Sequence, residues 1–179
     1  MTIKMTASHA RWPKVDDPIF AKLERVRKAK KKYGIKNIID STVGCLRDEN
    51  GELITFNSVY STFYSLDKNI LASYAFVSGD LDFQNNVIDV CFGENKPSAF
   101  IRSVATVGGL GAVRHGIWTY VRENDYVICA DWYWKAYEDI CDELNRKFRT
   151  FKLFNDTYSF NINSFKYTLE ESLIDKDRV

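Results

Sequence analysis

A glycine-rich turn lies at Val104-Ala-Thr-Val-Gly-Gly-Leu-Gly-Ala-Val113. The apolar residues at 100–106 predict a strand, and the residues after the turn follow a helical pattern, with Leu110, Val113 and Ile117 on one face. A strand that feeds a helix through glycines leaves backbone N–H groups at an open end, where the helix dipole favours an anion such as phosphate. A Gly-Gly turn between a strand and a helix can also be plain turn chemistry, and both interpretations stay open at this point.

A second apolar run, Tyr126-Val-Ile-Cys-Ala130, predicts another strand that delivers Trp134 to the same sheet edge. A phosphate-binding turn beside a flat aromatic ring suits a cofactor made of a phosphate and an aromatic heterocycle. A tryptophan after a strand also fits ordinary core packing. The wider pattern of motifs therefore has to separate the two interpretations.

Several motifs occur in a particular order, and this order resembles the N-terminal part of the class I/II aminotransferases. These are the pyridoxal-phosphate enzymes of the aspartate and aromatic aminotransferase type. The resemblance runs from about residue 16 to about residue 165 and covers less than half of such an enzyme. The motifs are Asp17-Pro-Ile-Phe20, Val43-Gly44 ahead of Arg47-Asp-Glu-Asn-Gly51, Tyr74 ahead of Gly79, Gly108-Gly-Leu-Gly-Ala112 and Asp131-Trp-Tyr-Trp134.

The resemblance implies an α/β fold: an incomplete three-layer α/β/α large domain of a fold-type-I enzyme, with mostly parallel strands and helices on both faces. Residues 1–16 would be an N-terminal arm and residues 17–179 the N-terminal part of the aminotransferase domain, whose large domain is truncated. The strand at 100–106 would lie apart from the pair at 126–130 and 148–153, because the strands between them would come from residues that this chain lacks. We therefore expect a gap in the sheet, or else a rearranged or swapped sheet.

Local patterns predict the other elements. Asp17 reads as an N-cap, Pro18 as the first helical residue and Gly34 as the residue that ends the helix. A short strand is expected at 37–40. Further helices are expected at 59–66, at 81–91 behind Asp80, after Gly109, and within 156–171.

The resemblance also implies a cofactor site for pyridoxal 5′-phosphate. Gly108 and Gly109 would wrap the phosphate through backbone N–H groups, and Trp134 would stack on the pyridine ring. Leu110 stands where many relatives carry Thr or Ser, so it lacks their hydroxyl. A lost hydrogen bond to a charged group costs on the order of 1.5–3 kcal/mol unless another group replaces it.

Two further residues are carried over from the family. Tyr74 would reach the cofactor phosphate of the neighbouring subunit, which implies a homodimer, although a half-buried tyrosine near a turn is the alternative. Gly44 would lie near the α-carboxylate of the substrate, although a lone glycine after a strand also fits a turn.

The groups that perform the chemistry in the family are a Schiff-base lysine, an acid at the ring nitrogen and an arginine for the substrate carboxylate. No lysine here matches the family motif, so no catalytic residue is assigned. One hypothesis is part of an aminotransferase that acts on an amino acid and a 2-oxo acid, inactive as this chain alone. The other is a non-catalytic binding or assembly protein that reuses the half-fold, or one half of a split enzyme with a separately encoded C-terminal remainder. The sequence does not specify which amino acid would be the substrate.

Composition excludes several other classes of protein. Of 179 residues, 45% are hydrophobic and 15% aromatic, which indicates a globular chain, and the net charge of +1 gives no sign of nucleic-acid binding. The basic run Lys28-Ala-Lys-Lys-Lys32 fits a solvated helix face. No cysteine spacing indicates a metal site, and His9 and His115 have no catalytic partners in the sequence. With no long apolar run, we expect a cytoplasmic protein without membrane contact.

Overall fold

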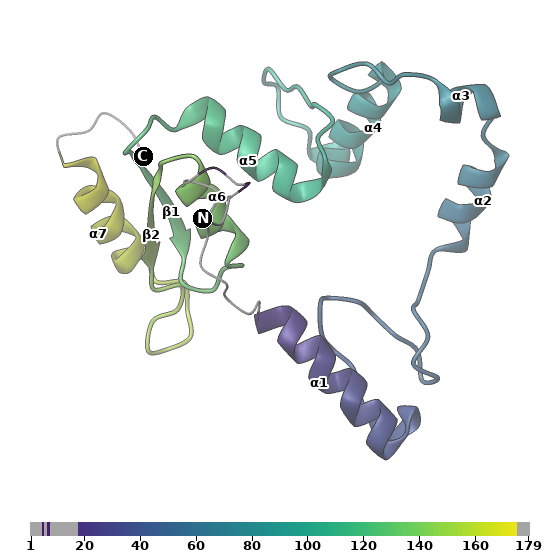
Figure 1. Cartoon of the computed structure of the whole chain (residues 1–179). Helices are drawn as coiled ribbons and strands as arrows, with labels where there is room; N and C mark the ends of the chain where they lie inside the picture. The colour runs from purple at the N-terminus through teal and green to yellow at the C-terminus, as the bar shows by residue number, and fades with distance from the viewer. Residues whose placement is uncertain (1–4, 6, 8–17, 175–179) are drawn as a thin grey trace. The chain divides into compact units, whose positions relative to one another are not determined.

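The structure, a computed structural model, describes Met5, Ala7 and residues 18–174, and it divides into two units, Met1–Ser73 and Tyr74–Val179. The first unit contains α1 (Pro18–Tyr33), the 3-10 helix η2 (Ile35–Asn37), α2 (Asn57–Ser65) and α3 (Lys68–Ala72). The second unit contains α4 (Leu81–Phe92), the 3-10 helix η3 (Gly93–Asn95), α5 (Gly108–Tyr120), β1 (Tyr126–Ala130), α6 (Ala136–Glu143), β2 (Lys147–Phe151) and α7 (Ile162–Leu173) (Figure 1). None of the helices in these described ranges is long and apolar enough to cross a membrane.

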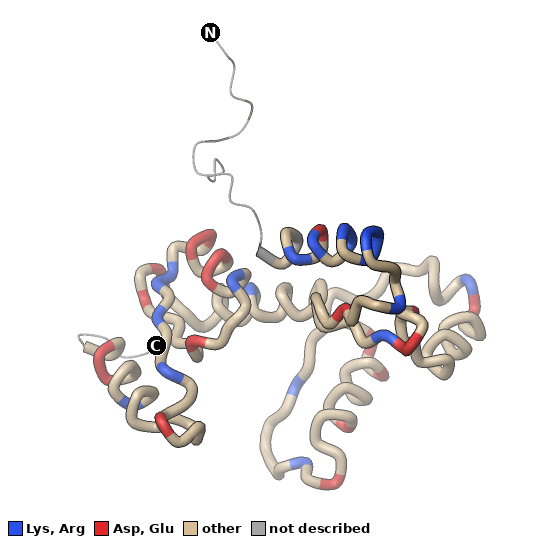
Figure 2. The backbone as a smooth tube through the Cα atoms, turned by 90° about the horizontal axis from the view of Figure 1, so that it is seen from below, with Lys and Arg blue, Asp and Glu red and all other residues tan. Residues whose placement is uncertain are grey.

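Helix α1 confirms the first predicted helix. Gly34 has φ +90° and donates its N–H to the carbonyl of Lys30 at 2.9 Å, and this backbone conformation suits a glycine that ends a helix. Figure 2, which colours the backbone by residue type, shows Lys and Arg positions distributed along the helix. The predicted N-cap Asp17 and most of the predicted arm at 1–16 lie outside the described residues.

The first unit has no core of its own in its described part, because none of those residues is buried. Helix α2 lies close to the predicted range of 59–66. The strand predicted at 37–40 is wrong: η2 occupies the start of that segment, and Asp40 is held by an ion pair with Lys30 instead of by a strand partner. An apolar Ile-Ile pair is thus not sufficient to form a strand when no neighbouring backbone lies alongside it.

The second unit is organised around the parallel pair β1 and β2. The register aligns Val127 with Phe148 and Ile128 with Arg149, and α6 forms the crossover between the strands. A parallel pair needs such a crossover because the chain must return to the same end of the sheet. Both predicted strands, 126–130 and 148–153, are confirmed, with β2 shifted slightly toward the N-terminus.

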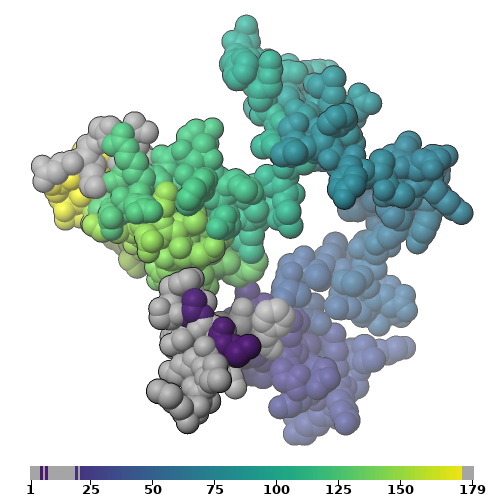
Figure 3. Space-filling view, turned by 45° about the horizontal axis from the view of Figure 1, so that its top comes forward, coloured from purple at the N-terminus to yellow at the C-terminus, as the bar shows by residue number. Residues whose placement is uncertain are grey.

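Helices cover both faces of this pair, as expected for three layers. On one face, Ile117 of α5 forms the core with Cys141 and Leu144, and Val127 and Phe148 pack against this cluster. On the other face, α7 contacts β2: Arg149 donates to the hydroxyl of Ser172 at 3.1 Å, and the ring of Phe151 lies 5.2 Å from that of Phe165. Figure 3 shows the segments from α5 to α7, coloured green to yellow, packed into one continuous region.

The strand predicted at 100–106 is not formed, and the sheet contains β1 and β2 alone within the described residues. The absence of pairing between 100–106 and β1 agrees with the gap expected from the resemblance. The last predicted helix starts later than expected, at Ile162, since Phe154 and Phe160 form an antiparallel bridge across the preceding loop. Asn161 caps this helix by accepting the N–H of Ser164 at 3.0 Å.

Contacts with the start of α4 hold the segment before the glycine turn in place. The N–H of Ala105 donates to the carbonyl of Ser78 at 2.9 Å, and the hydroxyl of Ser103 donates to the carbonyl of Gln84 at 2.8 Å. Gly79 has φ +86°, and a Cβ atom at this position would lie 2.8 Å from the Cβ of Ala105. The close approach of the two segments therefore requires glycine at position 79.

We expect Gly79→Ala to destabilise the second unit by at least about 1–2 kcal/mol, since the left-handed backbone and the overlap with Ala105 both oppose a side chain. The matched control is Gly116→Ala inside α5, where the added Cβ would meet nothing within 4 Å apart from its chain neighbours and the backbone of its own helix. This control should stabilise the unit by about 0.5–1 kcal/mol because alanine favours a helix. Urea unfolding followed by circular dichroism measures both effects, and equal stability of the two variants would contradict the role given to Gly79.

Candidate functional site: the glycine turn at the start of α5

The chain enters α5 through two backbone turns. Val107 has φ −75° and ψ 81°, and the N–H of Gly108 donates to the carbonyl of Thr106 at 2.9 Å, which is the geometry of an inverse γ-turn. Gly108 then adopts φ +64°, a conformation that favours glycine. The γ-turn and the left-handed glycine therefore lie directly at the point where the helix begins.

The start of α5 has unpaired backbone donors. No side chain caps the helix at Val107, and the N–H of Gly111 is the first to bond back, to the carbonyl of Val107 at 3.2 Å. Within the described residues, no hydrogen bond takes the N–H of Gly109 or Leu110. These two N–H groups point out of the N-terminal end of the helix, where the dipole attracts an anion.

Trp134 is positioned by the segment that follows β1. The N–H of Asp131 donates to the carbonyl of Phe151 at 2.8 Å, and its carboxylate accepts the N–H of Leu153 at 3.0 Å. The bond from Leu153 and the nearby Lys152 ammonium lower the pKa of Asp131. At the other end, the carbonyl of Trp134 accepts the N–H of Tyr137 at 2.9 Å, so both ends of the segment are held by hydrogen bonds.

The glycine turn and Trp134 line one pocket of about 560 Å³, and its walls are Val107, Gly108, Gly109, Leu110, Val113, Trp134 and Tyr137. Trp134 is 46% exposed, and its ring meets that of Tyr137 edge to face at 6.3 Å. The volume falls within the usual range for small-molecule sites. Four of the six predicted site residues therefore share a pocket that combines anion donors with an aromatic face.

The residues of the pocket fit the phosphate of pyridoxal phosphate in two respects. A Cβ atom at Gly108 or Gly109 would meet nothing within 4 Å apart from its chain neighbours and the backbone of its own helix, so the space beside the turn is open to a ligand. The donors at Gly109 and Leu110 suit a phosphate oxygen. Leu110 adds an apolar side chain to the wall and no hydroxyl.

The other two predicted site residues lie elsewhere. Tyr74, at the start of the second unit, is fully exposed, which does not match the half-buried tyrosine considered from the sequence. Gly44 belongs to the first unit, where it has φ +65° in a turn after Val43. The cofactor and substrate roles of Tyr74 and Gly44 stay predictions.

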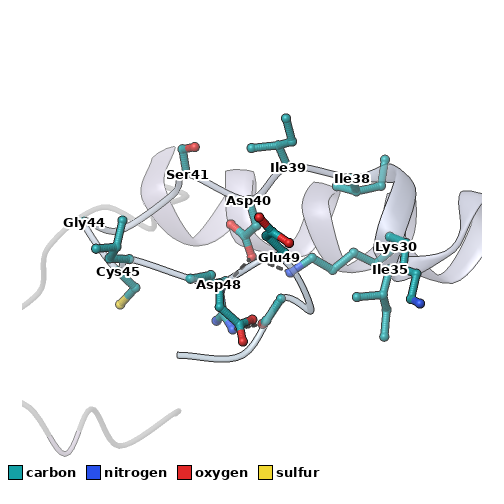
Figure 4. A pocket seen from close by; sticks show the side chains of 14 residues that line it. Lys30, Ile35, Ile38, Ile39, Asp40, Ser41, Gly44, Cys45, Asp48 and Glu49 are labelled. Atoms are coloured by element: carbon teal, nitrogen blue, oxygen red, sulfur yellow. Dashed lines mark hydrogen bonds and ion pairs between the residues drawn. The ribbon is translucent and has the colours of Figure 1, made fainter. Parts of the chain in front are cut away.

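Gly44 lines a second pocket, in the first unit, which contains a network of charged side chains around Asp40 (Figure 4). The carboxylate of Asp40 pairs with the ammonium of Lys30 at 2.6 Å and with the guanidinium of Arg47 at 3.6 Å, and it accepts the hydroxyl of Thr42 at 2.7 Å. The bonds from Lys30 and Thr42 lower the pKa of Asp40 to about 2. A carboxylate held in its charged form in this way connects α1 to the following turn and is poorly suited to act as a general acid.

The sequence did not reveal three residues of the α5 pocket: Val107, Val113 and Tyr137. Val113 occupies the apolar face expected of α5. Tyr137 could have been found from its place three residues after Trp134. Elsewhere, Tyr133 packs its ring 4.8 Å from Phe148, while Trp132 is 74% exposed. Of these two aromatic residues, Tyr133 packs against β2, whereas Trp132 lies mostly at the surface.

Neither thiol nor metal chemistry is apparent near this pocket. Burial raises the pKa of Cys141 to about 11, and it also raises the pKa of Cys129, so both thiols are poor nucleophiles. The described ranges contain no group of three or more His, Cys, Asp or Glu side chains arranged to hold a metal ion. His115 is exposed on α5.

Two neighbouring glycines should respond differently to alanine. Gly108→Ala should lower the stability by about 1–2 kcal/mol because its backbone is left-handed. Gly109→Ala should leave the stability unchanged or slightly higher but weaken phosphate binding, because its Cβ would enter the open space beside the turn. Thermal unfolding and a phosphate titration followed by NMR measure the two effects, and a Gly109→Ala variant that binds phosphate as well as the unsubstituted chain would count against the anion site.

The carboxyl group of Asp40 should titrate near pH 2, below its ordinary value of 3.8. Its contribution to stability should be complete above pH 3.8 and be lost as the pH falls toward 2, because the lowered pKa belongs to the folded form. Side-chain carboxyl NMR measures the titration. Lys30→Met should move the midpoint upward, and a midpoint of 3.8 or above in the unsubstituted chain would exclude the network.

The chain is similar to known aminotransferases in both sequence and structure. The model of the family described as aminotransferase class I and II matches residues 36–177. A solved aminotransferase from Anaerococcus prevotii is 39% identical with a TM-score of 0.93, over 98% of this chain and 43% of its own. No protein of curated function shows a significant match.

Two more distant solved structures support the fold. An aromatic amino acid aminotransferase with 3-indolebutyric acid is 23% identical with a TM-score of 0.67, over 89% of this chain and 41% of its own. The cytoplasmic aspartate aminotransferase of Saccharomyces cerevisiae is 18% identical with a TM-score of 0.66, over 90% of this chain and 40% of its own. The chain thus spans less than half of the length of each of the three structures. Its α/β architecture and the match over residues 36–177 show that the chain belongs to the class I and II aminotransferase family.

Proposed function

We propose that this chain provides the phosphate-binding part of a pyridoxal-phosphate aminotransferase. One observation carries the proposal: the unpaired N–H groups of Gly109 and Leu110 line the same pocket as Trp134. The donors would hold the phosphate of the cofactor, and Trp134 would lie against its ring. Residues 17–179 would then be the N-terminal part of the aminotransferase domain, preceded by an arm at 1–16.

When bound, pyridoxal phosphate supplies an electron-withdrawing ring that stabilises negative charge on the substrate carbon next to the amino nitrogen. The residues of this chain would bind and orient the group. The two N–H groups at the start of α5 would bind the phosphate, and the indole of Trp134 would restrain the tilt of the ring. Trp134 and Val113 would also exclude water from one side of the pocket.

The 179-residue chain by itself should bind the cofactor without transferring an amino group, because none of its lysines matches the family motif for the covalent attachment of the cofactor. In a complete enzyme the substrates would be an amino acid and a 2-oxo acid. Gly44 would approach the substrate carboxylate. Tyr74, whose side chain is fully exposed, would reach the cofactor of a second subunit in a homodimer.

The test is a titration of the purified chain with pyridoxal phosphate, followed by its visible absorbance. We expect saturable binding that is weakened about tenfold or more in Trp134→Ala, since stacking on an aromatic ring contributes on the order of 1–3 kcal/mol. The control is Trp132→Ala, because Trp132 is 74% exposed and does not line the pocket. Pyridoxal without its phosphate should bind much more weakly than the phosphate ester.

Borohydride reduction and mass spectrometry then test the absence of covalent attachment. We expect no single lysine to be labelled stoichiometrically, and no amino-group transfer. Stoichiometric labelling of one lysine would overturn the expected inactivity. Equal binding of pyridoxal and its phosphate would overturn the phosphate role of the turn.

A second candidate is a non-catalytic binding or assembly protein that reuses the half-fold, or one half of a split enzyme completed by a separately encoded C-terminal remainder. Leu110 favours it, because the phosphate turn lacks the hydroxyl that many relatives use. Large apolar side chains also remain exposed in both units, including Phe56 at 75% and Phe100 at 84%. Absence of any pyridoxal phosphate binding, together with a stable complex with a second polypeptide, would favour this candidate.

A further inference from the structure

Thr106 contacts both backbone polar groups of Gly108. Its carbonyl accepts the N–H of Gly108 at 2.9 Å, and its hydroxyl donates to the carbonyl of Gly108 at 3.0 Å. The carbonyl of Gly108 can accept this hydroxyl in addition to a helical N–H because it has two lone pairs. Thr106 therefore holds the glycine at the point where the chain turns into α5.

These bonds determine which backbone N–H groups remain available to an anion. The N–H of Gly108 is already used by the γ-turn, so it is not available to a ligand. The donors are then Gly109 and Leu110, whose direction depends on the φ of +64° at Gly108. Glycine can adopt a wider range of backbone angles than any other residue. The hydrogen bond from the Thr106 hydroxyl is the second contact that keeps Gly108 in a single conformation.

We infer that Thr106 is a positioning residue for the phosphate site. Its hydroxyl fixes the conformation of Gly108, so that the N–H groups of Gly109 and Leu110 stay directed into the pocket. Thr106 itself does not line the pocket and acts through Gly108. This inference rests on the proposed function, and it explains how a turn with Leu110 in place of a hydroxyl residue can still present an ordered pair of donors.

Two variants separate the hydroxyl from the shape of the side chain. Thr106→Val removes the hydroxyl and keeps the branching at Cβ, whereas Thr106→Ser keeps the hydroxyl and loses the methyl group. The probe is inorganic phosphate, added to the ¹⁵N-labelled 179-residue chain at constant ionic strength. The readouts are the shifts of the Gly109 and Leu110 amides and the hydrogen exchange of the Gly108 amide.

We expect Thr106→Val to weaken phosphate binding about tenfold, the effect of one hydrogen bond, and to speed the exchange of the Gly108 amide. Thr106→Ser should restore both readouts, and the melting temperatures should stay similar. Thr106→Val with unchanged affinity and exchange would overturn the inference while the proposed function stands. Failure of phosphate to shift the Gly109 and Leu110 amides of the unsubstituted chain would instead refute the proposed function, and the binding role of Thr106 with it.

Discussion

The parallel pairing of β1 with β2 is the constraint on which the α5 pocket depends. Parallel strands end at the same edge of a sheet, and the segment after β1 is bonded there to the end of β2 through Asp131. This pairing fixes where Trp134 emerges. The core that joins α5 and α6 to the strands, formed by Ile117, Cys141 and Leu144, then places the start of α5 beside it. The pocket is thus a product of the packing in the second unit.

The second unit has a small core and leaves much apolar surface exposed. Four apolar residues are buried in the described chain, and all of them belong to the second unit: Ile88, Ile117, Cys141 and Leu144. β1 is apolar along its length and has one strand neighbour within the described residues. β2 carries Lys147 and Arg149, charges typical of a sheet edge. The exposed apolar surface and the single strand neighbour of β1 agree with a chain that spans less than half of the solved aminotransferases it resembles.

Sequence reasoning succeeded where the pattern is local or is read against a known family. Helices α1, α2 and α4, the two strands and the glycine at the end of α1 follow from periodicity and from Gly34. It failed at 37–40 and 100–106, where apolar residues lie without strand partners in the described structure. Strand formation needs a second backbone at hydrogen-bonding distance, and no local pattern reports whether one is there.

The properties of the glycine turn depend partly on its residue types and partly on the tertiary structure. Its residue types alone determined that the backbone can turn at Gly108 and that an anion is favoured at the start of α5, because these properties need only the absence of a Cβ atom and the direction of a helix. Only the tertiary structure decided which N–H groups are unpaired, that Thr106 takes both polar groups of Gly108, and that Trp134 shares the pocket. The shared pocket depends on packing between segments that are distant in the sequence. The hydrogen bonds of the turn depend on its backbone angles. Residue types alone specify neither.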